Sequence, residues 1–221
     1  MRMSPDDHAR VAAPIRAAEA TTDGEIGVVV SRASDSYQDV VLLWAVALAL
    51  LPLAFSVAWP RPLLAAAGWF SHWEEPSLRL ILLVLAAATA ATFLLGYWLC
   101  GLTAIRMRLV PEAIKEHRAR RRAIMLFRAG TEQRTRSRTG VLLYLSLAER
   151  EAEIVADAAI HARAPHECWG EAMAVLIDGL KANRPGEAIA GAVERIGVVL
   201  AEHFPHTGSD PNELPDRMIE L

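Results

Sequence analysis

The chain has 221 residues, of which 53% are apolar and 22% are charged. Its formal net charge of −3 gives no basis for nucleic-acid binding, and its two cysteines provide neither a disulfide framework nor a metal cluster. The apolar share exceeds the roughly 45–50% that is usual in soluble proteins, and the excess is concentrated in two stretches.

The N-terminal segment predicts a helix followed by a strand. Ser4 is suited to cap a helix that has Pro5 in its first turn, and apolar residues then recur at helical spacing. Residues 21–24 are expected to end this helix. The run Glu25–Ser31 (EIGVVVS) is rich in β-branched residues, which is typical of a buried strand.

Two uncharged apolar stretches follow, at about residues 40–59 and 80–105. At about 1.5 Å per residue, twenty helical residues cross the roughly 30 Å hydrocarbon core of a bilayer. The alternative, a buried helix in a soluble protein, is less consistent with helices that are apolar on every face. We therefore predict a transmembrane hairpin over residues 39–110. The connector 60–79 contains leucine and tryptophan side chains and is expected to lie on the outer membrane surface.

The charges around the hairpin predict its orientation. Many basic residues follow the second stretch, whereas the connector has few, and positively charged flanks usually face the cytoplasm. This predicts a multi-pass protein of the cytoplasmic (inner) membrane with both termini in the cytoplasm. The basic run is sufficient as a topology signal, but it is also suited to bind anionic lipid head groups. The candidate head-group residues are Arg106, Arg108, Arg118, Arg121 and Arg122.

The segment after the hairpin predicts more helices and strands. In chain order they are a helix over 112–129, strands over 141–147 (VLLYLSL) and 151–157 (EAEIVAD), helices over 169–181 and 186–203, and a poorly ordered tail over 206–221. The short connection between the two strands predicts an antiparallel hairpin. Strand 25–31 must then pair in parallel with strand 141–147 across the membrane insertion. Segments 1–38 and 112–205 are accordingly expected to form one discontinuous α/β domain.

Two segments resemble a known family. Thr22–Val30 (TDGEIGVVV) resembles the first strand of TPM domains, and Arg138–Arg150 (RTGVLLYLSLAER), followed by Glu153–Asp157 (EIVAD), resembles their central hairpin. The resemblance covers about residues 5–38 and 118–204. It implies an α/β sandwich around a small mixed sheet in a membrane-anchored bacterial member. Here the two transmembrane helices are inserted between the first and second strands rather than placed at one end.

The resemblance implies two possible functions. The first is a non-catalytic interaction or adaptor module, whose partners are the lipid bilayer and another membrane protein or a second copy of the chain. The second is a membrane-bound, divalent-metal-dependent hydrolase, because a plant member is described as an acid phosphatase. Many members have glycines where this chain has Ala156 and Asp157, and this difference weakens the transfer of phosphatase activity.

The residues themselves offer one candidate ligand site. Parallel strands bring their carboxyl ends to the same edge of a sheet, where ligands tend to bind. That edge is expected to carry Ser34, Asp35, Ser36, Glu149 and Arg150. Carboxylates and hydroxyls are suited to hold Ca²⁺ or Mg²⁺, although the same residues also fit ordinary loops. No catalytic residue, resident cofactor or standard metal-ligand spacing is predicted.

Overall fold

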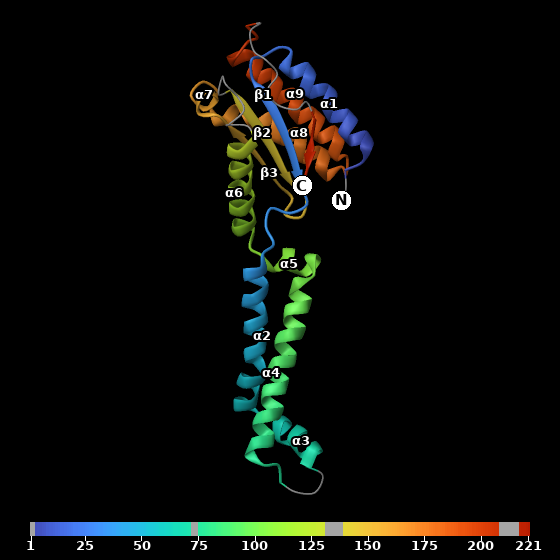
Figure 1. Cartoon of the computed structure of the whole chain (residues 1–221), viewed down its shortest axis with the longest axis vertical. Helices are drawn as coiled ribbons and strands as arrows, with labels where there is room; N and C mark the ends of the chain where they lie inside the picture. The colour runs from blue at the N-terminus through green and yellow to red at the C-terminus, as the bar shows by residue number, and fades with distance from the viewer. Residues whose placement is uncertain (1–2, 72–74, 131–138, 208–216) are drawn as a thin grey trace. The chain divides into compact units, whose positions relative to one another are not determined.

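The computed structural model describes residues 3–71, 75–130, 139–207 and 217–221 (Figure 1). The chain divides into two compact units. The first consists of Met1–Asp35 together with Ala113–Leu221, and the second is Ser36–Glu112. Each unit is described by itself.

Among its described residues, the first unit contains a mixed sheet of four strands in the order β3-β2-β1-β4. Strand β1 (Glu25–Ser31) pairs in parallel with β2 (Gly140–Ser146), and β2 pairs in antiparallel fashion with β3 (Glu151–Ala156). The predicted strands and both predicted pairings are confirmed. The long connection between β1 and β2 follows from their parallel pairing, since parallel neighbours cannot be joined by a tight turn.

The expectation of a poorly ordered tail over residues 206–221 is wrong for its last residues. Strand β4 (Ile219–Glu220) pairs in parallel with β1, and Leu221 N–H donates to the Val30 carbonyl over 2.9 Å. Met218 is buried and belongs to the core. A two-residue strand has no periodicity to reveal it; it forms because β1 otherwise presents an unpaired edge. Residues 208–216 lie outside the described residues.

Helices cover both faces of the sheet. They are α1 (Pro5–Glu19), α6 (Glu112–Gly130), α7 (Ala158–His161), α8 (Gly170–Lys181) and α9 (Pro185–His203), with the 3₁₀ turn η1 (His166–Trp169). Side chains alternate along a strand, so each strand contributes to two cores. Val28 and Leu143 belong to one core with residues of α1, α8 and α9, whereas Val29 and Leu142 belong to a second core with residues of α6.

Helix α1 begins as the sequence predicts. The Ser4 hydroxyl accepts from Asp7 N–H over 3.1 Å, while the Asp7 carboxylate accepts from Ser4 N–H over 2.8 Å. This reciprocal pair satisfies backbone donors that the first helical turn leaves without partners. The hydrogen bonds from Ser4 lower the pKa of the Asp7 carboxyl below its ordinary value.

The described part of the second unit includes the helices α2 (Gln38–Ala58), α3 (Pro60–Ser71), α4 (Leu78–Gly101) and α5 (Thr103–Leu109). Helices α2 and α4 are each long and apolar enough to cross a membrane. The second predicted stretch, 80–105, is not one continuous helix. Leu102 is extended, with φ −64° and ψ 127°, and separates α4 from α5. Helix α3 occupies much of the predicted connector.

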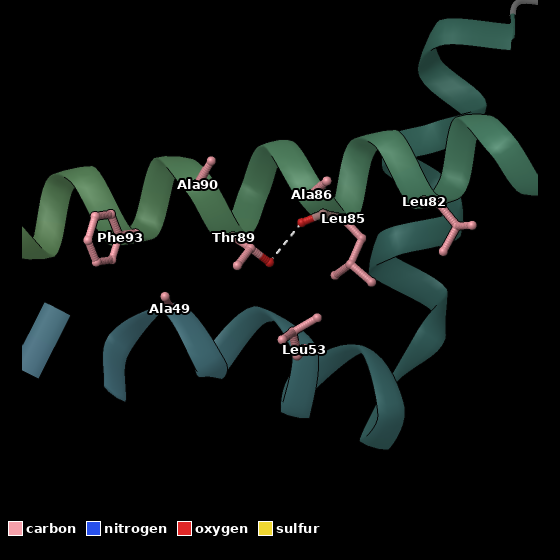
Figure 2. Close-up of a pocket in the computed structure, with 8 residues that line it drawn as sticks. All are labelled: Ala49, Leu53, Leu82, Leu85, Ala86, Thr89, Ala90 and Phe93. Carbon is pink, nitrogen blue, oxygen red and sulfur yellow. Dashed lines mark hydrogen bonds between the residues drawn. The ribbon is translucent and has the colours of Figure 1, made fainter. Parts of the chain in front are cut away.

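Helices α2 and α4 pack closely at small residues. A Cβ added at Gly96 would lie 2.9 Å from Leu48 Cδ1, and Ala45 is fully buried opposite it. Further along, Ala49 and Leu53 face Ala86 and Ala90 across an apolar groove of about 600 Å³ (Figure 2). Small residues let two helix backbones approach without a hydrophobic driving force, which is how helices associate in lipid.

Candidate functional site

The carboxyl ends of β1 and β2 are joined by a buried carboxylate. Glu149 is 6% exposed; its Oε1 accepts from Ser34 N–H over 2.8 Å, and its Oε2 accepts from the Ser146 hydroxyl. The hydroxyls of Ser34 and Tyr144 lie 3.0 Å apart and share a hydrogen bond. We call Ser34, Tyr144, Ser146 and Glu149 the strand-end cluster.

The turn between β2 and β3 positions Glu149. Leu147 N–H donates to the Ser31 carbonyl and Ala148 N–H to the Arg32 carbonyl, both over 3.0 Å, so β1 anchors the start of the turn. Arg150 then adopts a left-handed conformation with φ 60°, which few non-glycine residues occupy. This backbone path turns the Glu149 side chain inward, while Arg150 is exposed.

The five predicted ligand-binding residues do not converge. Ser34 and Glu149 meet as expected, because the carboxyl ends of parallel neighbours lie at one edge. Asp35 instead pairs with Arg118 over 2.9 Å, and the Ser36 carbonyl accepts from Arg106 over 3.0 Å. Ser36 and Arg106 both belong to the second unit, so this hydrogen bond lies within that unit. Arg150 remains on the surface.

The strand-end cluster is a closed hydrogen-bonded network. Both Glu149 oxygens accept hydrogen bonds, Oε1 from the Ser34 N–H and Oε2 from the Ser146 hydroxyl. Within the described ranges, no three histidine, cysteine, aspartate or glutamate side chains gather as metal ligands do. The hydrogen bonds of the cluster connect β1, β2 and the turn that follows β2.

Asp35→Ala should have little effect on stability. The Asp35 and Arg118 side chains are 43% and 21% exposed, and ion pairs in such surroundings contribute about 0.2–1 kcal/mol. We expect the free energy of unfolding to fall by less than about 1 kcal/mol. Chemical unfolding of the purified chain in detergent measures this change, and a loss of about 3 kcal/mol, as for a buried charged hydrogen bond, would contradict the prediction.

The predicted head-group residues divide into two sets. Arg106 donates to the Ser36 carbonyl, and Arg118 pairs with Asp35. Arg122 is partly buried, and its Nε has no hydrogen-bond partner. Arg108 and Arg121 are exposed on α5 and α6. The exposed pair is therefore better suited to meet lipid phosphates than the other three arginines.

Sequence reasoning missed Tyr144 and Ser146. Both are polar residues in a run that otherwise predicts a buried strand, and they are two residues apart, so they share one face. A buried strand with polar side chains on one face signals a hydrogen-bonding network there. Glu149, three residues after Ser146, supplies its acceptor.

A second polar cluster joins the start of β1 to the segment after α9. The Asp23 carboxylate accepts from the Thr207 hydroxyl over 2.6 Å and from Thr207 N–H over 2.8 Å, and it pairs with His206 over 3.0 Å. The two hydrogen bonds from Thr207, with the His206 charge adding a smaller effect, lower the pKa of the Asp23 carboxyl. These contacts attach the segment that follows α9 to the segment that precedes β1.

This cluster should loosen in acid. A carboxyl whose pKa is lowered on folding stabilises the fold above its ordinary pKa of 3.8, and that contribution is lost as the pH falls through the lower folded value. We expect the Thr207 amide NMR signal to shift as the pH falls below 3.8, and its protection from exchange to fall relative to an unstructured amide at the same pH. Asp23→Asn should remove that dependence. An identical titration in the variant would contradict the assignment.

Comparisons with known proteins identify a fold but no family. No family model and no curated protein matches the chain. The solved NMR structure of the BA42 protein from the psychrophilic bacterium Bizionia argentinensis superposes with a TM-score of 0.58 at 15% identity. The match covers 100% of this chain and 97% of the BA42 chain. At this identity the similarity concerns the fold alone.

Proposed function

We propose that the chain is a membrane-anchored TPM-like domain that acts as a non-catalytic interaction module at the cytoplasmic surface of the inner membrane. The strand-end cluster is the observation that carries the non-catalytic part of this proposal. Its buried carboxylate, Glu149, accepts from two protein donors, and Asp35 is paired with Arg118. The carboxylates at this edge take part in hydrogen bonds and an ion pair within the protein, which favours a structural role over a catalytic one.

The exterior of α2 and α4 supports the membrane anchor. Leucine, phenylalanine and tryptophan side chains project around the helix pair, including Leu43, Phe55 and Trp98, which are 68%, 51% and 62% exposed. The hydroxyl groups of Ser56 in α2 and Thr89 in α4 bond within their own helices. Ser56 donates to the Pro52 carbonyl and Thr89 to the Leu85 carbonyl. An apolar exterior with internally satisfied polar groups suits lipid, where no water is available to hydrogen-bond.

The basic residues after α4 support the cytoplasmic orientation of the first unit. Arg106 and Arg108 lie on α5, and α6 adds Lys115, Arg120 and Arg121. Positive charge within about 15–20 residues of a spanning helix favours the cytoplasmic side. With two crossings, this orientation puts both termini in the cytoplasm and makes the exposed arginines candidates for binding anionic lipid.

Two measurements on the full chain test the proposal. In lipid nanodiscs it should hydrolyse p-nitrophenyl phosphate no faster than empty nanodiscs, with either Mg²⁺ or Ca²⁺ present. Affinity purification from gently solubilised membranes should recover a defined membrane protein in near-stoichiometric amount. Turnover that disappears in the folded variants Asp35→Ala or Glu149→Gln would instead support the metal-dependent hydrolase.

A further inference from the structure

We propose that the side of β1 that faces β4 is a docking site for an extended segment of a partner protein, and that residues 217–221 cover this site until the partner replaces them. We call residues 217–221 the covering segment. The inference rests on the proposed function, because it names the surface through which an interaction module would bind. The partner segment pairs in parallel with β1, so main-chain hydrogen bonds supply affinity and neighbouring side chains supply specificity.

The backbone of β1 determines how long the docking site is. Successive residues of a strand bond to opposite neighbours, and the Ser31 carbonyl accepts from the residue that follows β2. The even-numbered residues of β1 therefore face the other side. Ile26 N–H on that side already donates to the Glu19 carboxylate over 3.0 Å, which closes the start of the strand. The docking site consequently extends over residues 28–32.

The covering segment occupies this site through few contacts. Leu221 N–H donates to the Val30 carbonyl over 2.9 Å, and Arg32 N–H donates to the main-chain oxygen of Leu221 over 3.1 Å. Met218 is 3% exposed, and the other four residues of the segment are exposed. Segments with few buried apolar contacts open more readily than core strands do. The covering segment can therefore leave β1 while the rest of the first unit stays folded.

Departure of the covering segment leaves an open edge on the sheet. Strand β4 is the last strand of the described sheet on this side, so β1 becomes the edge strand. The Val30 carbonyl and the Arg32 N–H then lose their strand partner. An exposed strand edge with such groups is a template for pairing with another chain. The site is therefore suited to exchange one extended segment for another.

The covering segment shows which side chains the site accepts. Met218 lies in the core, and Glu220, two residues later on the same face, has its Oε2 3.7 Å from Nε2 of His8 in α1. Ile219 and Leu221 lie on the other face and are 41% and 50% exposed. A fitting partner segment therefore carries an apolar residue and, two positions later, an acidic residue.

Peptide binding to the full chain in nanodiscs tests the inference. The probe is a fluorescent peptide with the sequence of residues 217–221 (RMIEL), titrated by fluorescence polarisation. Met218→Asp places a charge in the core and should release the covering segment. We expect this variant to bind the peptide at least about tenfold more tightly than the wild type, because the competing segment no longer fills the site. Met218→Leu keeps the apolar anchor and should bind the peptide as the wild type does.

A second variant releases the covering segment without changing the core. Leu221→Pro removes the N–H that donates to the Val30 carbonyl, and the Leu221 side chain is 50% exposed. It should raise peptide binding as Met218→Asp does, whereas Leu221→Ala keeps the N–H and should not. Thermal unfolding shows whether each variant folds, and Leu221→Pro keeps the test decisive if Met218→Asp does not fold.

Charge exchange tests the chemistry of the partner segment. In the Leu221→Pro chain, the added change His8→Glu should weaken peptide binding, because it places a second carboxylate beside the glutamate of the peptide. Replacing that glutamate with lysine should restore binding. A peptide with aspartate in place of its methionine should not bind the Leu221→Pro chain.

Several outcomes would overturn the inference. They are peptide binding to no variant, equal binding to the wild type and both released variants, or equal binding of the peptide that contains aspartate. A wild-type dimer that Met218→Asp dissociates would also overturn it, because a second copy would then fill the site. Phosphoester turnover would count against the proposed function, whereas failure of peptide binding alone leaves the non-catalytic, membrane-anchored module standing.

Discussion

Glu149→Ala should lower the free energy of unfolding of the first unit by about 3 kcal/mol, because hydrogen bonds to a charged acceptor contribute about 1.5–3 kcal/mol each. The Glu149 carboxylate accepts from Ser34 N–H and from the Ser146 hydroxyl, and it is almost fully buried. The substitution leaves both donors without this acceptor. It also removes the side-chain link between the turn and Ser34, while the backbone bonds from Leu147 and Ala148 to the end of β1 remain.

Chemical unfolding in detergent, followed by circular dichroism, measures this loss. Glu202→Ala is the matched control, because Glu202 is exposed on α9 and alanine favours a helix. The control should change stability by less than about 0.5 kcal/mol. Millimolar Ca²⁺ should not raise the melting temperature of the wild-type chain. A Ca²⁺-dependent rise that is lost in Glu149→Ala would show that the cluster opens to bind a cation.

Gly197→Leu should be similarly damaging, because α1 and α9 touch at this glycine. A Cβ added at Gly197 would lie 2.5 Å from Ala18 Cβ and 3.3 Å from Ala18 Cα. The obstacle includes backbone, so the helices must move apart rather than adjust a side chain. Overpacking of a core typically costs about 1–3 kcal/mol, and a whole leucine side chain belongs at the upper end of that range.

Gly170→Leu is the control for this prediction. Nothing lies within 4 Å of a Cβ added at Gly170, at the start of α8. Leucine also favours a helix over glycine, so stability should be unchanged or slightly higher. Thermal unfolding in the same detergent compares the two variants. Equal stability of Gly197→Leu and the wild type would contradict the close packing of α1 on α9.

The elements that sequence predicts well are those with a clear pattern. Glu25–Ser31 is recognisable as a buried strand because β-branched residues fill it, and the helix over 186–203 because Ile189, Val193, Ile196 and Leu200 share a face. Their pairing follows from connection length. Strand β4 was missed because two residues have no period, and the break at Leu102 was missed because no charge or proline interrupts the apolar stretch there.

The candidate site was predicted only in part, for a physical reason. Parallel pairing determines where strand ends lie, so Ser34 and Glu149 were expected to meet, and they do. Side-chain partners depend on packing that spacing does not reveal. Arg118 from α6 pairs with Asp35, and the buried hydroxyls of β2 turn towards Glu149. Of the residues that spacing suggested as a cation site, Ser34 and Glu149 hydrogen-bond to each other and Asp35 pairs with Arg118.

Cysteine accessibility in intact cells tests the membrane anchor and its orientation most directly. In a chain whose Cys100 and Cys168 are replaced, one cysteine is introduced at exposed Trp69 in α3 or at exposed Glu202 in α9. An impermeant maleimide should label position 69 in intact cells and position 202 only after the inner membrane is permeabilised. Labelling of position 202 but not position 69 would reverse the proposed orientation, and equal labelling of both would contradict the transmembrane hairpin.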